Sequence, residues 1–232
     1  LHLSVHSFPT RRSSDLRLAQ AARRYGYDGL VIRTRETDFD PGVLRERYDV
    51  DVVPAVEVVA EEPPSASGAV GNFRPDFPVV LVRGGTDALN RFAVEQDRVD
   101  VLAAPLSGEG SFNHVLAKAA ATHATRVEFD LGPALRASGG RRVRALKGLR
   151  KLREIVDHYD APYVVSARPA SHLQLRSARE LVALGAELGF AEDWIRAGLT
   201  EWGRLAARNR KRLSAEFISP GVRVDRCEED DR

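Results

Sequence analysis

A run of basic side chains between residues 136 and 153 is the part of the sequence with the clearest chemistry. It reads RASGGRRVRALKGLRKLR and contains no acidic residue. Its eight basic members are Arg136, Arg141, Arg142, Arg144, Lys147, Arg150, Lys151 and Arg153. Positive charge at this density attracts polyanions, and RNA or DNA is the first candidate. A solvated helix face is the alternative explanation of the same pattern.

The chain as a whole gives no polyanion signal, because its 232 residues carry a net charge of only +2. The choice of cation is more informative, since only four of the 35 basic residues are lysine. Arginine suits bidentate binding of phosphate. GC-rich codon usage is the other explanation for so much arginine.

Two acidic residues and one histidine could form a catalytic site. Glu128 and Asp130 alternate with apolar residues, so both point to one face of a strand, which in a barrel could be the interior. There they could bind Mg²⁺ or pair with Arg33 or Arg83, and we favour the ion pair. His172 lies in a loop after a strand, where barrel enzymes place catalytic groups. A metal-dependent phosphoesterase using Glu128, Asp130 and His172 is therefore one hypothesis.

The absence of several known catalytic motifs argues against the enzyme classes that use them. The sequence has no HExxH, CxxC, GxSxG or phosphate-loop motif, and its histidines show no metal-ligand spacing. His114 begins a helix after a strand end, where a capping or surface histidine is the more common role. No apolar run approaches the ~18 residues of a membrane span. The single cysteine, Cys227, allows no disulfide within the chain and indicates a reducing, cytoplasmic location.

The elements that must position these groups alternate along the chain. Near-continuous apolar stretches indicate parallel strands covered on both sides. They span 29–33, 49–60, 78–85, 99–105, 126–131 and 162–167. Helical patterns separate them, and the number and length favour one irregular TIM-like (β/α) barrel domain over residues 16–222.

The basic run opens into a predicted helix from about Arg141 to Tyr159. Its apolar stripe consists of Val143, Leu146, Leu149, Leu152 and Val156, with basic side chains on either side. Further helices are predicted at 178–188, 191–197 and 201–213, and residues 61–75 are predicted to be a polar loop of unassigned role. Arg204, Arg208, Arg210, Lys211 and Arg212 form a second basic run that could extend the same surface.

The two ends of the chain are unusual. The sequence contains no methionine, and residues 1–15 resemble strings produced when sequencing-adapter DNA is translated. We interpret them as a non-native segment and set them aside, with a natural polar arm as the alternative. A strand should precede the first helix (16–25), and this segment occupies its place. Residues 223–232 form an acidic tail that we expect to be disordered.

Four stretches resemble one known family. They are RGGTDALNRFAVEQDRVDVLAAP (83–105), SFNHVLAKAAA (111–121), VEFDLGPAL (127–135) and SARPASHLQLRSARELVALGAELGF (166–190). Their order and spacing resemble those of archaeal ribonuclease P protein component 3, the thirty-kilodalton-type subunit of the RNase P and RNase MRP proteins. The resemblance runs from about Leu16 to Val222, and the family's first strand has no counterpart in residues 1–15.

This resemblance implies an irregular TIM-like barrel, similar to metal-dependent PHP phosphoesterases but without their His-x-His ligands. It implies a subunit of ribonuclease P, which removes the 5′ leader from precursor tRNA. The RNA subunit would carry the catalysis with Mg²⁺, and the isolated protein would be inactive and hold no cofactor or metal. The expected partners are the RNase P RNA, the small ferredoxin-like component 2, other RNase P proteins and precursor tRNA as the holoenzyme's substrate.

The predicted phosphate contacts follow from the charge pattern and this resemblance together. Arg141, Arg142, Arg144, Lys147 and Lys151 are the first choices. Arg91, Lys118 and Arg176, within the stretches that carry the resemblance, are second choices. Surface salt bridges are the alternative role for each of them. Two other hypotheses stay open at this point, the phosphoesterase and a protein scaffold that acts without RNA.

Overall fold

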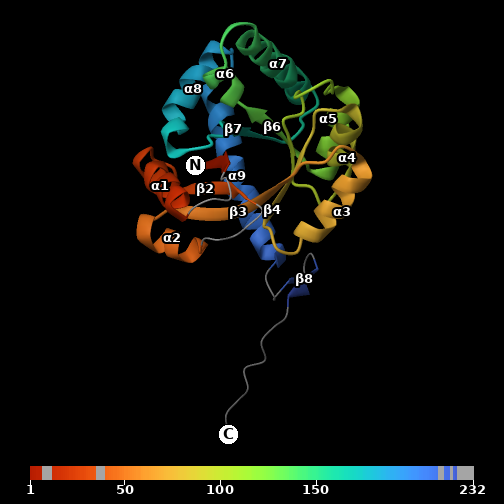
Figure 1. Ribbon diagram of the computed structural model, residues 1–232. Helices are drawn as coiled ribbons and strands as arrows, with labels where there is room; N and C mark the ends of the chain where they lie inside the picture. The colour runs from red at the N-terminus through yellow and green to blue at the C-terminus, as the bar shows by residue number, and fades with distance from the viewer. Residues whose placement is uncertain (7–11, 35–39, 214–216, 220–221, 224–232) are drawn as a thin grey trace.

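Seven parallel strands, each hydrogen-bonded to the next in chain order, form the centre of the molecule. The computed structural model describes residues 1–6, 12–34, 40–213, 217–219 and 222–223. The strands are β1 (His2–His6), β2 (Gly29–Arg33), β3 (Asp51–Val58), β4 (Val79–Arg83), β5 (Val101–Ala103), β6 (Arg126–Asp130) and β7 (Tyr163–Ser166). Figure 1 shows a ring of helices around them, which confirms the predicted TIM-like barrel.

The helices cover the outside of the strands and one end of the barrel (Figure 1). They are α1 (Arg12–Arg24), α2 (Pro41–Tyr48), α3 (Pro63–Phe73), α4 (Asp87–Glu95), α5 (His114–His123), α6 (Gly132–Arg136), α7 (Gly139–His158), α8 (Ala178–Glu187) and α9 (Glu192–Leu213). A 3₁₀ turn, η1 (His172–Gln174), precedes α8, and a short hairpin of β8 (Phe217–Ser219) and β9 (Val222–Arg223) follows α9.

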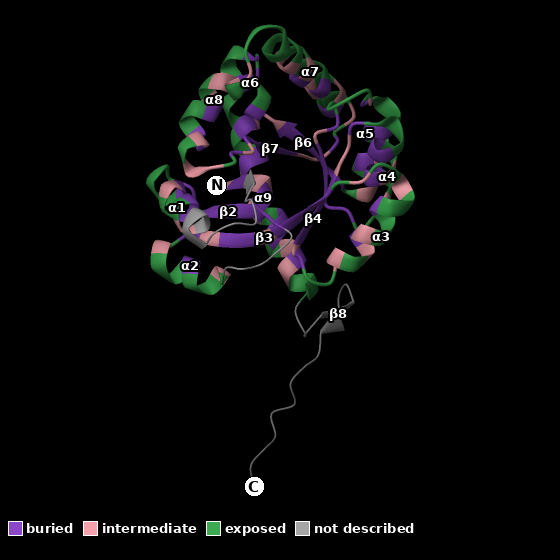
Figure 2. Cartoon of the chain, in the orientation of Figure 1, coloured by how far each residue is buried: buried purple, intermediate pink, exposed green. Residues whose placement is uncertain are grey.

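The strands are buried on both faces, and their side chains alternate between two apolar layers (Figure 2). Leu30 and Ile32 of β2 point outward and pack under the helices, whereas Val31 between them points into the barrel. The interior layer continues through valine, alanine and leucine side chains of the other strands. Because β-branched residues fill a pleated, two-sided surface well, these short strands form readily.

Helix α9 covers the amino-terminal end of the barrel and bridges its open edge. It packs against both β1 and β7, between which no strand pairing occurs among the described residues. Trp202, Leu205 and Ala206 extend the interior apolar layer, and the Trp202 indole donates to the Val165 carbonyl at 2.8 Å. Gly198 permits this close approach, because a Cβ there would lie 2.5 Å from the Val165 Cγ2 atom. The predicted break near Gly198 was wrong, because α9 is one helix from Glu192 to Leu213.

Two further expectations concern residues 1–15 and 61–75. The non-native origin of residues 1–15 stays a prediction; within them, His2–His6 form β1 in parallel register with β2 and so occupy the expected place of the first strand, and Leu3 and Ser4 are fully buried. Residues 61–75 contain helix α3 rather than a loop, because prolines are compatible with the first turn of a helix and Ala66 and Val70 bury its inner face. Residues 224–232, including Cys227 and most of the predicted tail, lie outside the described residues.

Candidate nucleic-acid interface

Helix α7 carries the basic run and is held by one apolar side. Leu149, Leu152 and Val156 are buried against the barrel. Val143, predicted to belong to the same stripe, is 49% exposed. The helix therefore packs firmly over its second half, while its first turns extend along the edge of the barrel with few apolar contacts.

Three of the eight basic residues in the run bind groups within the protein. Arg136 donates to the carbonyl of Ala167 at 2.9 Å. Arg150 donates to the carbonyl of Glu187 at 3.1 Å, and Arg153 binds the Gly189 carbonyl. The last two arginines thus engage carbonyls at the end of α8, where basic side chains are favoured.

The other five basic residues are exposed and form no ion pair or hydrogen bond among the described residues. They are the first-choice phosphate contacts of the sequence analysis, and we call them the α7 cations: Arg141, Arg142, Arg144, Lys147 and Lys151. The structure thus places all five on one helix with their donors free. Free guanidinium and ammonium groups on a rigid helix can neutralise phosphates of a nucleic acid.

The second-choice residues lie on other elements and have partners. Arg91 of α4 pairs with Glu95 at 2.8 Å, and Arg176 lies 3.8 Å from Glu180 across the start of α8. Lys118 of α5 is closer to the basic helix, because its ammonium lies 5.4 Å from the centre of the Tyr159 ring, directly after α7.

The second basic run does not extend this surface. Arg208 and Arg210 of α9 pair with Asp100 at 3.3 Å and Asp51 at 2.8 Å, at the amino-terminal ends of β5 and β3. The first turns of α7 lie instead beside the carboxyl-terminal end of β6. These arginines fix the last helix under the barrel, and the expectation of a continuous surface was wrong.

A buried charge network occupies the barrel interior near the carboxyl-terminal ends of the strands. At its centre is the fully buried Arg33 of β2, which donates to Glu57 at 3.0 Å and binds both carboxylate oxygens of Glu128. Ser4 accepts from its Nε atom at 2.8 Å, and Ser166 donates to Glu128 at 2.5 Å. The predicted ion pair between Glu128 and Arg33 is confirmed.

Electrostatic attraction within this network outweighs the cost of burial. Burial alone would lower the pKa of Arg33, but attraction to Glu128 and Glu57 raises it above its usual value. Burial alone would likewise raise the pKa of Glu57, yet attraction to Arg33, Arg168 and Arg83 lowers it to about 2. Both side chains are therefore charged at neutral pH.

The pKa of Asp130 is shifted in the opposite direction from that of Glu57. Its Oδ1 atom accepts from the Gly132 amide at 2.8 Å, but its Oδ2 atom is 3.7 Å from the Arg168 guanidinium, beyond hydrogen-bond distance. Burial and repulsion from Glu128 raise the pKa of Asp130 to about 6. Asp130 is thus the least satisfied carboxylate of this region.

The geometry does not favour the phosphoesterase hypothesis. The described residues contain no group of three or more histidine, cysteine or acidic side chains placed to hold a metal ion. The Arg33 guanidinium binds Glu57 and Glu128 at the position where such an ion would need them. His172 lies in η1 and His114 begins α5, exposed, with its ring 6.2 Å from that of Tyr159.

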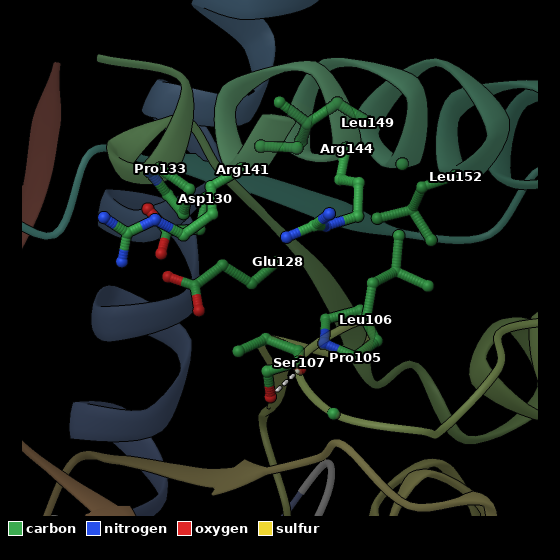
Figure 3. Close-up of a pocket in the computed structure, with 14 residues that line it drawn as sticks. Pro105, Leu106, Ser107, Glu128, Asp130, Pro133, Arg141, Arg144, Leu149 and Leu152 are labelled. Atoms are coloured by element: carbon green, nitrogen blue, oxygen red, sulfur yellow. Dashed lines mark hydrogen bonds between the residues drawn. The ribbon is translucent and has the colours of Figure 1, made fainter. Parts of the chain in front are cut away.

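A cleft of about 400 Å³ lies between α7, the loop after β5 and the end of β6. Figure 3 shows Arg141 and Arg144 reaching into it near Glu128 and Asp130, with Leu106 and Leu152 to one side. Three segments that are separated in the sequence form this cleft, so it could not be predicted from the sequence. The alternation that placed Glu128 and Asp130 on an inward face was the available signal.

None of the described helices has both the length and the apolar character that a membrane span requires.

The sequence matches one family of known proteins. The sequence model of the family described as RNase P subunit p30 matches residues 1–214. Ribonuclease P protein component 3 of Halorubrum lacusprofundi is 55% identical over 241 residues, covering 99% of this chain and 100% of the relative. The component 3 of Haloarcula marismortui is 51% identical over 228 residues, covering 97% of each chain.

A solved structure has the same fold. A chain in the cryo-EM structure of archaeal ribonuclease P with mature tRNA superposes with a TM-score of 0.82. The match covers 98% of this chain and 100% of the other, at 20% sequence identity. An identity this low supports the barrel architecture alone.

Proposed function

The chain belongs to the RNase P subunit p30 family, and from this premise we propose that it binds the RNA of ribonuclease P and supports removal of 5′ leaders from precursor tRNA. The observation that carries the proposal is the set of five α7 cations, exposed on a rigid helix and without partners among the described residues. Structured RNA is recognised mostly through its shape and backbone, so a base-reading motif is not required.

The α7 cations would act by neutralising phosphates and releasing counterions. Packing of Leu149, Leu152 and Val156 fixes the axis of the helix, so its charges meet the RNA without a large ordering cost. Bound in this way, the protein would stabilise the folded catalytic RNA and lower its demand for Mg²⁺.

Catalysis is assigned to the RNA, with Mg²⁺ as its cofactor, and the isolated protein is proposed to be inactive. The support comes from the barrel interior, where Arg33 binds Glu57 and Glu128. A carboxylate that binds a guanidinium in this way is a poor metal ligand or general base.

The remaining partners follow from the family. We propose that the protein assembles with the ferredoxin-like component 2 and other ribonuclease P proteins, and that precursor tRNA is the substrate of the assembly. A cytoplasmic location is part of the same proposal.

The test is an omission assay on precursor tRNA cleavage at moderate Mg²⁺, with and without this chain, beside the chain alone. We expect cleavage to require both the RNA and this chain, and no cleavage by the chain alone. Cleavage by the chain alone would contradict the proposal and favour a phosphoesterase. Full activity without the chain would also contradict it.

Substitution of Arg141, Arg142 and Arg144 by alanine sharpens this test. The affinity for RNase P RNA should fall, and the slope of log affinity against log salt concentration should flatten by about two to three, because each lost phosphate contact removes close to one. Alanine at the exposed Arg24, Arg45 and Arg179, away from α7, is the matched control and should leave the slope unchanged. An unchanged slope in the α7 variant would indicate a scaffold that acts without RNA.

A further inference from the structure

The cleft beside α7 is lined by groups of three kinds. Arg141 and Arg144 line it and have no partner among the described residues. Asp130, at its floor, has an Oδ2 atom without a hydrogen bond. Leu106 and Leu152 give it an apolar wall. A ligand that fits must therefore combine an anionic group, a flat apolar body and hydrogen-bond donors.

The charge of the cleft favours an anion in spite of its acidic floor. The three carboxylates beneath it, Glu57, Glu128 and Asp130, lie among the guanidinium groups of three arginines. These arginines are Arg33, Arg83 and Arg168. Among the described residues the inner groups balance, so Arg141 and Arg144 leave the cleft with an excess of two positive charges.

The size of the cleft matches a single nucleotide. At about 400 Å³ it falls in the lower part of the range of roughly 300–1,000 Å³ found for small-ligand sites. Its apolar side chains come from the loop after β5 and from the buried half of α7, so one wall can contact the face of a base. The arginines lie on the first turns of α7, nearer the opening.

We propose that this cleft binds one unstacked guanine nucleotide, with its phosphate at Arg141 and Arg144 and its base edge at Asp130. Guanine presents two adjacent donors, N1–H and N2–H₂, to a single carboxylate. Uracil presents one donor between two carbonyl groups, which a carboxylate repels. Proteins commonly read an unpaired base through its Watson–Crick edge and an apolar contact with its face.

The proposal rests on the RNA-binding function above and gives that function a second contact of different chemistry. The α7 cations hold phosphates wherever the strand passes, whereas the cleft holds one base. The nucleotide can come from an RNA strand or from a free guanosine phosphate, and these sources are separated by experiment.

Calorimetric titration of the full chain at pH 8, where Asp130 is ionised, tests the site. The probes are GMP, UMP, inorganic phosphate and single-stranded heptanucleotides with one central guanine or uracil. We expect guanine to be bound about tenfold more tightly than uracil, because a hydrogen bond to a charged group is involved. Binding of GMP itself would identify a free nucleotide as sufficient, and preference only within the heptanucleotides would identify an RNA strand.

Two variants separate the cleft from general attraction to phosphate. Ala145 lines the cleft, so Ala145→Trp fills it and keeps all α7 cations. The guanine preference should then disappear while phosphate binding remains. Asp130→Asn keeps the size of the side chain but removes its charge, and it should reduce the preference to about twofold or less. Glu154→Trp, exposed on the same helix outside the cleft, is the control and should behave as the unmodified chain.

The outcomes distinguish this proposal from the function on which it rests. Equal binding of guanine and uracil probes, or a guanine preference that survives Ala145→Trp, would overturn the cleft site. The omission assay could still show that the subunit is required. Conversely, the chain could prove dispensable for cleavage while Ala145→Trp abolishes the guanine preference. The cleft site would then stand, and the proposed function would be contradicted.

Discussion

Arginine has opposite roles in two regions of this molecule. In the barrel interior, Arg33 is fully buried and has acceptors on Ser4, Glu57 and Glu128. On the first half of α7, Arg141, Arg142 and Arg144 are exposed and have no acceptor among the described residues. The difference shows that the supply of acceptors by the chain, rather than the residue type, decides whether an arginine stabilises the fold or is available to a ligand.

The change from one role to the other occurs within a single helix. Arg150 and Arg153 lie on α7 with the free cations, yet both bind carbonyls at the end of α8. The basic run is thus two functional sets that overlap in sequence. Substitutions in each set test this division.

Removing the buried cation should have the largest effect on stability. Among the described residues, Arg33→Met leaves Glu128 with the Ser166 hydroxyl as its one hydrogen-bond partner and with a buried, uncompensated charge, so the free energy of unfolding should fall by about 3–5 kcal/mol. Urea denaturation followed by circular dichroism measures this change.

The double variant Arg33→Met with Glu128→Gln controls for lost packing. It removes both charges, so it should be more stable than Arg33→Met alone. A double variant that is less stable than Arg33→Met would contradict this explanation. It would show that the uncompensated charge of Glu128 does not cause the loss of stability.

The pH dependence of stability should differ between Asp130 and Glu57. The pKa of Asp130 is about 6 in the folded protein and 3.8 in the unfolded chain, so the folded state binds more protons between these values. The contribution of Asp130 to stability should therefore grow by on the order of 1–2 kcal/mol as the pH falls from 7 to 4. Glu57, with its lowered pKa, loses stability only as the pH falls below 4.5 toward 2.

Comparison of the unmodified chain with Asp130→Asn isolates this contribution. As the pH falls from 7 to 4, the unfolding free energy of the unmodified chain should rise relative to that of Asp130→Asn. A difference that stays constant over this interval would show that Asp130 titrates in the folded protein as in the unfolded chain.

Substitution of Lys147 and Lys151 by alanine should have the smallest effect on stability. Both are exposed and without partners among the described residues, so the free energy of unfolding should change by less than about 0.5 kcal/mol. The salt slope of RNA binding should still flatten by about one for each lysine, as measured by filter binding. A large loss of stability with an unchanged slope would place these lysines in the structural set.

The sequence predicted the barrel well, because its strands are short, apolar and rich in β-branched residues. The predictions of secondary structure were wrong where the local propensity of the residues and their packing in the fold favour different structures. Pro63, Pro64 and the glycines of α3 are typical of a loop, yet buried Ala66 and Val70 stabilise a helix there. Gly198 looks like a helix break, yet it is the residue that lets α9 contact β7.

The candidate site was predictable only in part. The five free cations are the ones favoured from charge pattern, and an inward-facing Glu128 suggested its pair with Arg33. The binding of Arg150 and Arg153 to the end of α8 could not be predicted, because those carbonyl acceptors lie more than 30 residues away along the chain. The cleft depends on distant segments in the same way.

The arrangement of β1, β7 and α9 has a consequence for how the chain folds. Every described barrel strand pairs with its neighbour in sequence, so the sheet can grow stepwise through contacts of short sequence separation. Trp202 and the bridge between β1 and β7, however, come from α9, which follows all seven strands. During synthesis the interior would stay open to water until this helix has left the ribosome, so completion of the barrel must be a late event.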